Sequence, residues 1–163
     1  MAEIAENGKA IESVWDYPRP PRLEQVEWRI RVVHGGATIV DAPRVQRVLE
    51  TSQPPAYYVD EEFIDMSFLR PSERQTFCEW KGVATYADVV VGDAIATAAA
   101  WTYRDPTPSF VEIVGHWAFY AQSLDECWVD DERVVPNDGM FYGGWITANV
   151  TGPFKGAPGT SHW

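Results

Sequence analysis

The stretch from Thr76 to Tyr86 places a Cys, a Lys, a Tyr and a lone Gly between two segments with strand character. The thiol of Cys78 is a candidate nucleophile or redox group, a role that needs a nearby cation to stabilise its thiolate form. Lys81 is near in sequence, but residues three positions apart point to opposite faces of a regular strand. The two side chains share one side only if Gly82 marks a bulge or a turn. The alternative is that Cys78 is a small buried apolar side chain, which is the usual role of a free Cys.

Lys81 and Glu50 are the other residues whose chemistry stands out. A Lys that precedes Gly at a strand bend can direct its ammonium into a cleft and bind an anion or a carbonyl group there, or it can be a solvated surface side chain. Glu50 can serve as a general acid or base if the fold buries it. Cys78, Lys81 and Glu50 therefore form the candidate catalytic set, although whether the protein is an enzyme stays open. The isolated His34 and His116 more often have structural roles, and the chain has no Ser–His–Asp order, phosphate loop or dinucleotide fingerprint.

The aromatic side chains form a second candidate group, because the chain has eight Trp, seven Tyr and seven Phe. If the chain turns at Gly92-Asp93, Tyr86 lies near Ala99 and within diagonal reach of Trp101. A Tyr–Trp–Tyr patch beside Lys81 suits a planar, polar or anionic small molecule. The alternative, favoured for most of these rings, is packing in a β-rich core with hydroxyl groups at its rim. The candidate ligand-binding residues are Lys81, Tyr86, Trp101, Tyr103 and Tyr58, with Tyr120 in the same aromatic group.

Length and composition indicate one domain with ordered extensions, because 163 residues with 45% hydrophobic content suffice for one core. The net charge of -11 argues against nucleic acid and against an anionic membrane surface as partners. The net charge does not exclude local basic patches, for which the candidates are Arg29, Arg31, Arg44 and Arg47. The N-terminus lacks the basic start and apolar run of a signal peptide, and no apolar run has the length of a membrane span. We therefore expect a cytoplasmic protein with reduced thiols.

Alternating apolar positions and turn residues predict a series of short strands. Arg29 and Arg31 alternate with apolar residues, and Gly35-Gly36 is a hairpin turn signal. β-branched residues within 43–50 favour a twisted strand over a short helix. The expected strands are 27–34, 37–40, 43–50, 56–59, 76–80, 83–91, 94–103 and 115–121, with turns at 92–93, 130–131 and 137–139 and an irregular loop or helical turn at 61–70.

These strands predict a mainly β fold of antiparallel sheets. Residues 27–122 are expected to form a single β domain. Residues 1–26 are expected to form an extended N-terminal arm, in which the prolines at positions 18, 20 and 21 exclude a ladder strand. Residues 123–163 form a turn-rich C-terminal extension. Its glycine and aromatic residues from Phe141 to Thr147 are too apolar to be free in water, so we expect the extension to pack on the core.

Several segments share a combined pattern: Cys78-Glu-Trp-Lys-Gly82 with Ala84 and Tyr86, Ala99–Tyr103, Gly115–Tyr120, Arg47–Glu50 and Pro55–Tyr58. Together they resemble the bacterial domain-of-unknown-function family 427, over roughly residues 29–122. Glu79 departs from the pattern, because many relatives would have Pro there. The resemblance implies a β-tent-like fold, similar to that of yippee-type and methionine-sulfoxide-reductase-B-type domains. It implies no activity, because the family is uncharacterised.

Two properties linked to this resemblance do not fit the residues. The family has a nucleotidyltransferase-like label, but that chemistry needs paired carboxylates for Mg²⁺ beside a glycine-rich phosphate loop. The one dense acidic run, Asp130-Asp131-Glu132, is typical of a solvated turn. Many β-tent relatives hold a structural zinc ion with two Cys-x-x-Cys knuckles, whereas Cys78 and Cys127 lie far apart. We therefore expect a fold without zinc knuckles, with no metal site and no cofactor.

The leading hypothesis is a small-molecule-binding β domain with an aromatic pocket that contains Lys81 and Glu50. One alternative is a thiol-dependent enzyme that uses Cys78, assisted by Lys81 or Glu50. A second alternative is an interaction module that docks a partner chain on an aromatic surface. The identity of the ligand and the oligomeric state do not follow from the residues.

Overall fold

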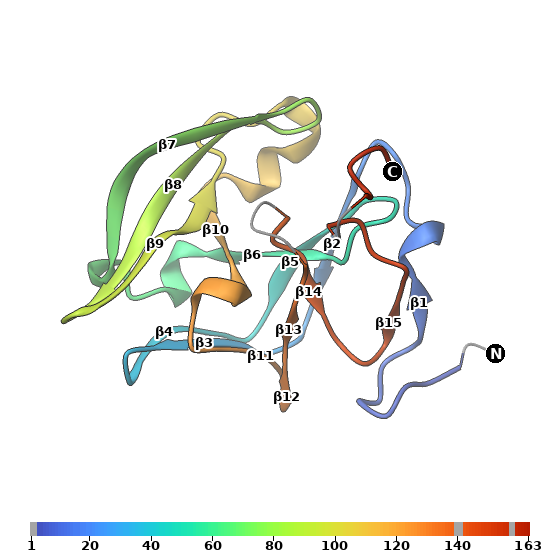
Figure 1. Cartoon of the computed structure of the whole chain (residues 1–163), viewed down its shortest axis with the longest axis horizontal. Coiled ribbons are helices and arrows are strands. Elements are labelled where there is room, and N and C mark those ends of the chain that lie inside the picture. Colours follow the sequence, from blue (N-terminus) through green and yellow to red (C-terminus); the bar gives the residue numbers. More distant parts are fainter. Residues whose placement is uncertain (1–2, 139–141, 157–158) are drawn as a thin grey trace.

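The computed structural model describes residues 3–138, 142–156 and 159–163, and in these ranges the chain is mainly β (Figure 1). The strands form two larger antiparallel sheets and two short strand pairs, which confirms the expected mainly antiparallel β fold. The helical parts are brief 3-10 turns: η1 (Val14–Asp16), η2 (Glu61–Phe63), η3 (Met66–Phe68), η4 (Pro108–Ile113) and η5 (Ala121–Ser123). None of the described residues belongs to a helix with the length and apolar character that crossing a membrane requires.

The larger sheet contains seven strands of the described chain, and each neighbouring pair is antiparallel. In spatial order they are β2 (Arg22–Val26), β5 (Val45–Leu49), β6 (Ala56–Asp60), β10 (His116–Phe119), β9 (Ala94–Thr102), β8 (Gly82–Val91) and β7 (Leu69–Cys78). In Figure 1 the end formed by β7, β8 and β9 curves over the upper left of the molecule. β7 is an edge strand, a position where a residue without a backbone donor such as Pro71 is tolerated.

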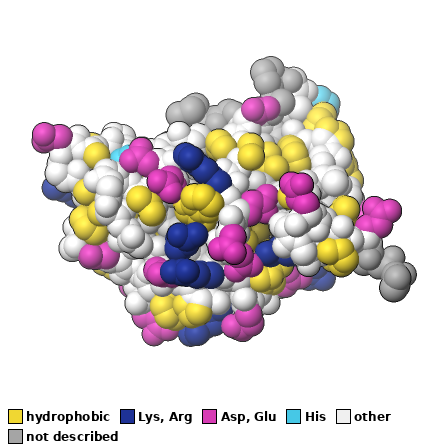
Figure 2. Space-filling model, turned by 90° about the horizontal axis from the view of Figure 1, so that it is seen from below, with side chains coloured by type: hydrophobic (Ala, Val, Ile, Leu, Met, Phe, Trp, Pro, Cys, Tyr) yellow, Lys and Arg dark blue, Asp and Glu magenta, His cyan; other side chains and the backbone are white. Residues whose placement is uncertain are grey.

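The smaller sheet contains four described strands, in the order β12 (Glu132–Arg133), β11 (Glu126–Val129), β3 (Ile30–His34) and β4 (Ala37–Ala42). It is the lower layer in Figure 1, and its inner side chains share a core with those of the larger sheet. Ile30 and Val32 are fully buried while Arg31 between them is partly exposed, as the alternating pattern predicted. Figure 2 shows the molecule from below, where Lys and Arg side chains lie among acidic and hydrophobic ones.

The turns and strands expected from glycine and β-branched residues agree largely with the structure. Gly35-Gly36 joins β3 to β4, Gly92-Asp93 joins β8 to β9, and β5 confirms the strand expected within 43–50. The strand expected at 76–80 is wrong in its bounds, because β7 begins at Leu69 and ends at Cys78. The chain reverses direction over residues 79–81, and Gly82 follows with a φ of 105° that suits glycine alone.

The two ends of the chain contribute strands to the sheets. β2 pairs with β5, and β11 pairs with β3, so the paired strands extend beyond the expected domain limits at 27 and 122. Cys127 and Val129 of β11 are buried in the core, which explains why this segment belongs to the sheet. β1 (Glu12–Ser13) pairs with β15 (Val150–Thr151), and β13 (Val135–Pro136) pairs with β14 (Trp145–Ile146). The expected turn at 137–139 and the start of the tail at position 141 include positions outside the described residues.

The four arginines for which the sequence did not exclude a local basic patch all contact acidic or aromatic side chains. Arg29 pairs with Asp41, and Arg44 pairs with Glu62. Arg31 lies 5.2 Å from the ring centroid of Trp128. Arg47 is not a surface residue, because its side chain is buried between two carboxylates, those of Glu12 and Glu24. Arg29 and Arg44 are therefore each neutralised by a neighbouring carboxylate, and Arg47 lies away from the surface.

Candidate functional site

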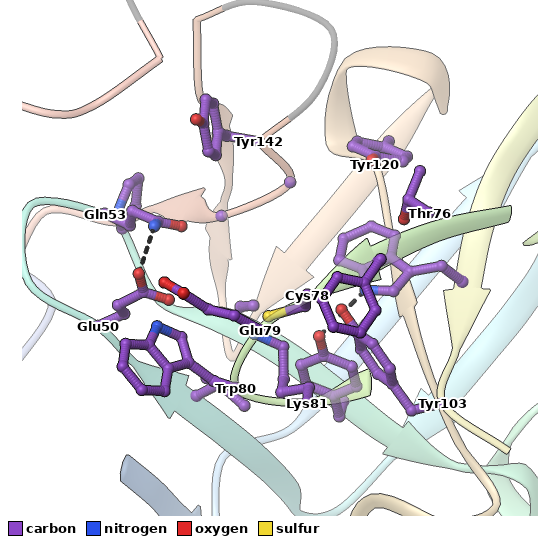
Figure 3. Close-up of a pocket in the computed structure, with 18 of the residues that line it drawn as sticks. Glu50, Gln53, Thr76, Cys78, Glu79, Trp80, Lys81, Tyr103, Tyr120 and Tyr142 are labelled. Atoms are coloured by element: carbon purple, nitrogen blue, oxygen red, sulfur yellow. Dashed lines mark hydrogen bonds between the residues drawn. The ribbon is translucent and has the colours of Figure 1, made fainter. Parts of the chain in front are cut away.

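A pocket of about 540 Å³ opens beside the β7–β8 hairpin (Figure 3). Its walls come from β5 and β6, from β7, β8 and β9, from the chain after β10 and from the C-terminal segment 142–155. Every residue proposed from sequence as catalytic or ligand-binding lines it: Glu50, Tyr58, Cys78, Lys81, Tyr86, Trp101 and Tyr103, together with Tyr120. The fold therefore brings together candidate side chains from distant parts of the sequence.

A bulge between β8 and β9 decides which rings face each other in this pocket. Near the turn Val89 pairs with Ala96, but two positions earlier Ala87 pairs with Ala100, so β9 carries two extra residues. The Asp88 carboxylate accepts a hydrogen bond from the Ala98 backbone N–H at 2.7 Å. As a result Tyr86 lies directly opposite Trp101. The expected pairing of Tyr86 with Ala99 is wrong by two residues, and the shift of two keeps the same face of the sheet.

The β7–β8 hairpin places Cys78 and Lys81 on the same pocket. Cys78 pairs with Gly82, so residues 79–81 form the turn between them. Thr107 holds this turn, because its hydroxyl donates to the Trp80 carbonyl at 2.6 Å and its backbone N–H donates to the Lys81 carbonyl at 3.1 Å. The condition set from the sequence, a turn at Gly82, is therefore met.

Lys81 is a buried cation without a carboxylate partner among the described residues. Its side chain points into the interior, with the residue only 8% exposed, and its Nζ lies 5.7 Å from the Tyr103 ring centroid and 5.8 Å from that of Phe110. Burial by itself lowers the pKa of Lys81, but the interactions with Tyr58, Cys78 and Glu50 outweigh burial and raise the pKa above its ordinary value. At neutral pH Lys81 is therefore an ammonium, which suits it to bind an anion rather than to act as an amine nucleophile.

Aromatic side chains line the wall opposite the turn. The Trp101 indole N–H donates to the Tyr58 hydroxyl at 3.0 Å, and the Trp101 and Tyr120 ring centroids are 4.5 Å apart. Tyr86 and Tyr120 are nearly parallel, with an interplanar angle of 8°. Burial raises the pKa of Tyr58 and of Tyr103, so both are neutral phenols at neutral pH. The wall thus offers flat apolar faces and hydroxyl groups that can donate or accept hydrogen bonds.

Glu50 lies on the same pocket with partners of its own. Its carboxylate accepts a hydrogen bond from the Gln53 amide at 3.0 Å, shown in Figure 3, and lies 3.7 Å from the guanidinium of Arg19. The charge of Glu50 is therefore partly balanced by Arg19, which does not line the pocket. The exposed Glu79 projects from the turn toward the same side in Figure 3.

Asp130 and Asp131 of the acidic run form the expected turn between β11 and β12, and Glu132 is the first residue of β12. The Asp130 carboxylate accepts hydrogen bonds from the Lys9 ammonium at 2.7 Å and from the Arg29 backbone N–H at 2.8 Å, so it ties the N-terminal residues to the smaller sheet. Among residues 3–138, 142–156 and 159–163, no three His, Cys, Asp or Glu side chains gather where they could hold a metal ion.

The family described as a domain of unknown function, DUF427, matches residues 22–130. The chain belongs to the DUF427 family. The matched region begins with β2 and ends just after β11, so it contains all seven described strands of the larger sheet. No curated protein matches this chain. The candidate residues from Glu50 to Tyr120 all lie within the DUF427 region.

One wall of the pocket comes from outside the DUF427 region, and sequence reasoning did not identify it. Tyr142, Gly143, Gly144 and Lys155 line the pocket. A Cβ atom added at Gly143 would lie 2.2 Å from the Trp101 ring, and one added at Gly144 would lie 2.3 Å from the Pro54 carbonyl oxygen. Only glycine allows the backbone to approach this closely. The Gly143-Gly144 pair among aromatic residues was the available signal for this wall.

Gly143→Ala is expected to lower the free energy of unfolding by about 2 kcal/mol, because the added methyl group overpacks the Trp101 contact. Urea denaturation followed by far-UV circular dichroism measures this loss. We also expect a shift in the tryptophan emission of the folded protein, because the indole of Trp101 must move. An unchanged urea midpoint would contradict the close packing of the C-terminal segment on Trp101.

Proposed function

We propose that this DUF427 protein binds a small molecule that carries an anionic group and a planar ring, and that it does so in the cytoplasm. The observation that supports this function is Lys81. Its ammonium is buried and faces the pocket, and no described carboxylate lies within ion-pair distance of it. Buried charges are normally paired, because an unpaired charge in a low-dielectric site is costly. An anionic ligand would supply the missing partner.

The shape and walls of the pocket support the same class of ligand. A volume of about 540 Å³ falls within the range typical of small-molecule sites. The rings of Trp101 and Tyr120 offer faces on which a flat ligand can pack, and the hydroxyl of Tyr58 can orient a polar substituent. A second ammonium, that of Lys155, lies on the pocket wall 5.2 Å from the Tyr142 ring centroid.

A docking role for a partner protein has weaker support. Phe77 and Val83 are cross-strand neighbours on the β7–β8 hairpin and are 73% and 46% exposed. Each side of a specific protein–protein interface contributes about 20 residues and buries on the order of 800 Å² of surface. One exposed pair of side chains is far smaller than that. The pocket is therefore the better basis for a function.

The test is a thermal-shift screen of aromatic carboxylic acids, each compared with its neutral primary amide. An acid present at about 100 times its Kd should stabilise the folded wild-type protein by about 2.7 kcal/mol, and its matched amide should have little effect. Lys81→Met should weaken binding of the acid at least tenfold, because a hydrogen-bonded charge contributes about 1.5–3 kcal/mol. Calorimetric titration of the same acid measures the change in Kd.

The matched control is Lys9→Met. Lys9 also lies near an aromatic ring, 4.8 Å from the Trp28 centroid, but it is paired with Asp130 and does not line this pocket. Its replacement should leave the Kd of the acid unchanged. Equal stabilisation by acids and amides, or full retention of acid binding in Lys81→Met, would overturn the proposed function.

A further inference from the structure

Cys78 is the pocket residue whose chemistry the binding function does not use. It pairs with Gly82 next to the turn of the β7–β8 hairpin, and its sulfur points into the pocket in Figure 3. Its side chain is partly exposed, whereas the other free thiol, Cys127, is only 3% exposed and lies in the core between the sheets. Of the two thiols, Cys78 is therefore the one that a molecule in the pocket can reach.

Lys81 gives the second, independent observation at this site. This residue is more than nine-tenths buried, it lines the same pocket, and no described carboxylate lies within ion-pair distance of its ammonium. Glu50 is engaged by Gln53 and Arg19, Glu79 is exposed, and neither carboxylate forms an ion pair with Lys81. An anion drawn to this ammonium would be placed beside the sulfur of Cys78.

We propose that Cys78 is a reactive thiol that forms covalent adducts with small electrophiles bearing a carboxylate, which Lys81 holds beside the sulfur. The Cys78 thiol gives its proton to solvent, and its sulfur forms a bond to the electrophilic carbon. The bond from that carbon to its leaving group breaks, and the leaving group departs with the bonding electron pair. Lys81 acts by proximity, because it raises the local concentration of the anionic reagent at the sulfur. The inference shares Lys81 with the proposed function but does not depend on its reversible ligand.

Iodoacetate and iodoacetamide are a matched pair of probes, since they are similar in size and both lose iodide, but only iodoacetate carries a carboxylate. We expect Cys78 of the folded wild-type protein to be carboxymethylated by iodoacetate. Lys81→Met should lower the ratio of the iodoacetate rate to the iodoacetamide rate by about tenfold, because the attraction to the carboxylate is lost. Intact-mass spectrometry gives the two rates, and peptide mapping assigns the modified thiol.

The controls separate charge, fold and thiol identity. Lys81→Gln removes the same charge with a polar side chain and should change the ratio as Lys81→Met does. Cys127→Ser should leave both rates unchanged, and Cys78→Ser should abolish modification of the folded protein. Modification of Cys127 in place of Cys78, or a rate ratio that both Lys81 variants leave unchanged, would overturn the inference.

The two proposals can fail separately. If Lys81→Met abolishes binding of aromatic acids but leaves the rate ratio unchanged, the reactive-thiol inference is wrong and the binding function stands. If the rate ratio falls as expected but no aromatic acid stabilises the wild-type protein, the inference stands and the binding function is wrong.

Discussion

Replacing Arg47 with Met is expected to lower the free energy of unfolding by about 3 kcal/mol. Arg47 on β5 is 2% exposed, and its guanidinium donates to the Glu12 carboxylate at 2.7 Å and also to the Glu24 carboxylate. It lies 4.7 Å from the ring centroid of Trp28. One side chain thus joins the N-terminal segment, β2 and β5. Its removal leaves two partly buried carboxylates without their cation. This lowers the free energy of unfolding more than the loss of an ion pair on the surface does.

Urea denaturation of Arg47→Met measures this loss, and Arg29→Met is the matched control. Arg29 also pairs with a carboxylate, that of Asp41 at 2.8 Å, but the two side chains are 56% and 49% exposed. Exposed pairs contribute about 0–1 kcal/mol, so this control should change stability little. Equal losses in the two variants would show that burial adds nothing to the Arg47 contacts.

The sheets could be predicted largely from local patterns. Alternating residues in β3 and the turn residues Gly35-Gly36 and Gly92-Asp93 predicted strands and hairpins correctly, because pleat direction and the positive φ of glycine are local properties of the chain. The end of β7 was predicted less well. Trp80 has high strand propensity, but the contacts of Thr107 with the Trp80 and Lys81 carbonyls hold that part of the chain as a turn.

The candidate pocket residues could be proposed because hairpin pairing brings neighbouring strands together, and the grouping of Cys78 with Lys81 depended on a single stated condition at Gly82. The role of Arg47 could not be predicted, because Glu12 and Glu24 are its partners only in the folded chain. The bulge at Asp88 was also missed. It depends on a side-chain hydrogen bond to Ala98, which no alternation of apolar residues reports.

Substitution of Trp145 tests whether the C-terminal segment outside the DUF427 region is part of the stable fold. Its side chain is 1% exposed, and its ring stacks on that of Tyr57 with centroids 5.1 Å apart. Its indole N–H donates to the Phe119 carbonyl at 2.9 Å. Tyr57 and Phe119 belong to β6 and β10 of the larger sheet, so Trp145 attaches the C-terminal segment directly to the family core.

Trp145→Ala is expected to lower the free energy of unfolding by about 4 kcal/mol, because it removes a fully buried indole and leaves a cavity against Tyr57. Urea denaturation measures the loss, with Trp15→Ala as the matched control. Trp15 is 41% exposed and meets the ring of Trp163 edge-on at 5.4 Å, so its replacement should cost far less. A small loss for Trp145→Ala would mean that the DUF427 region folds independently of the segment after it. A large loss would mean that the segment that brings Gly143 against Trp101 is a fixed wall of the pocket and not a removable cover.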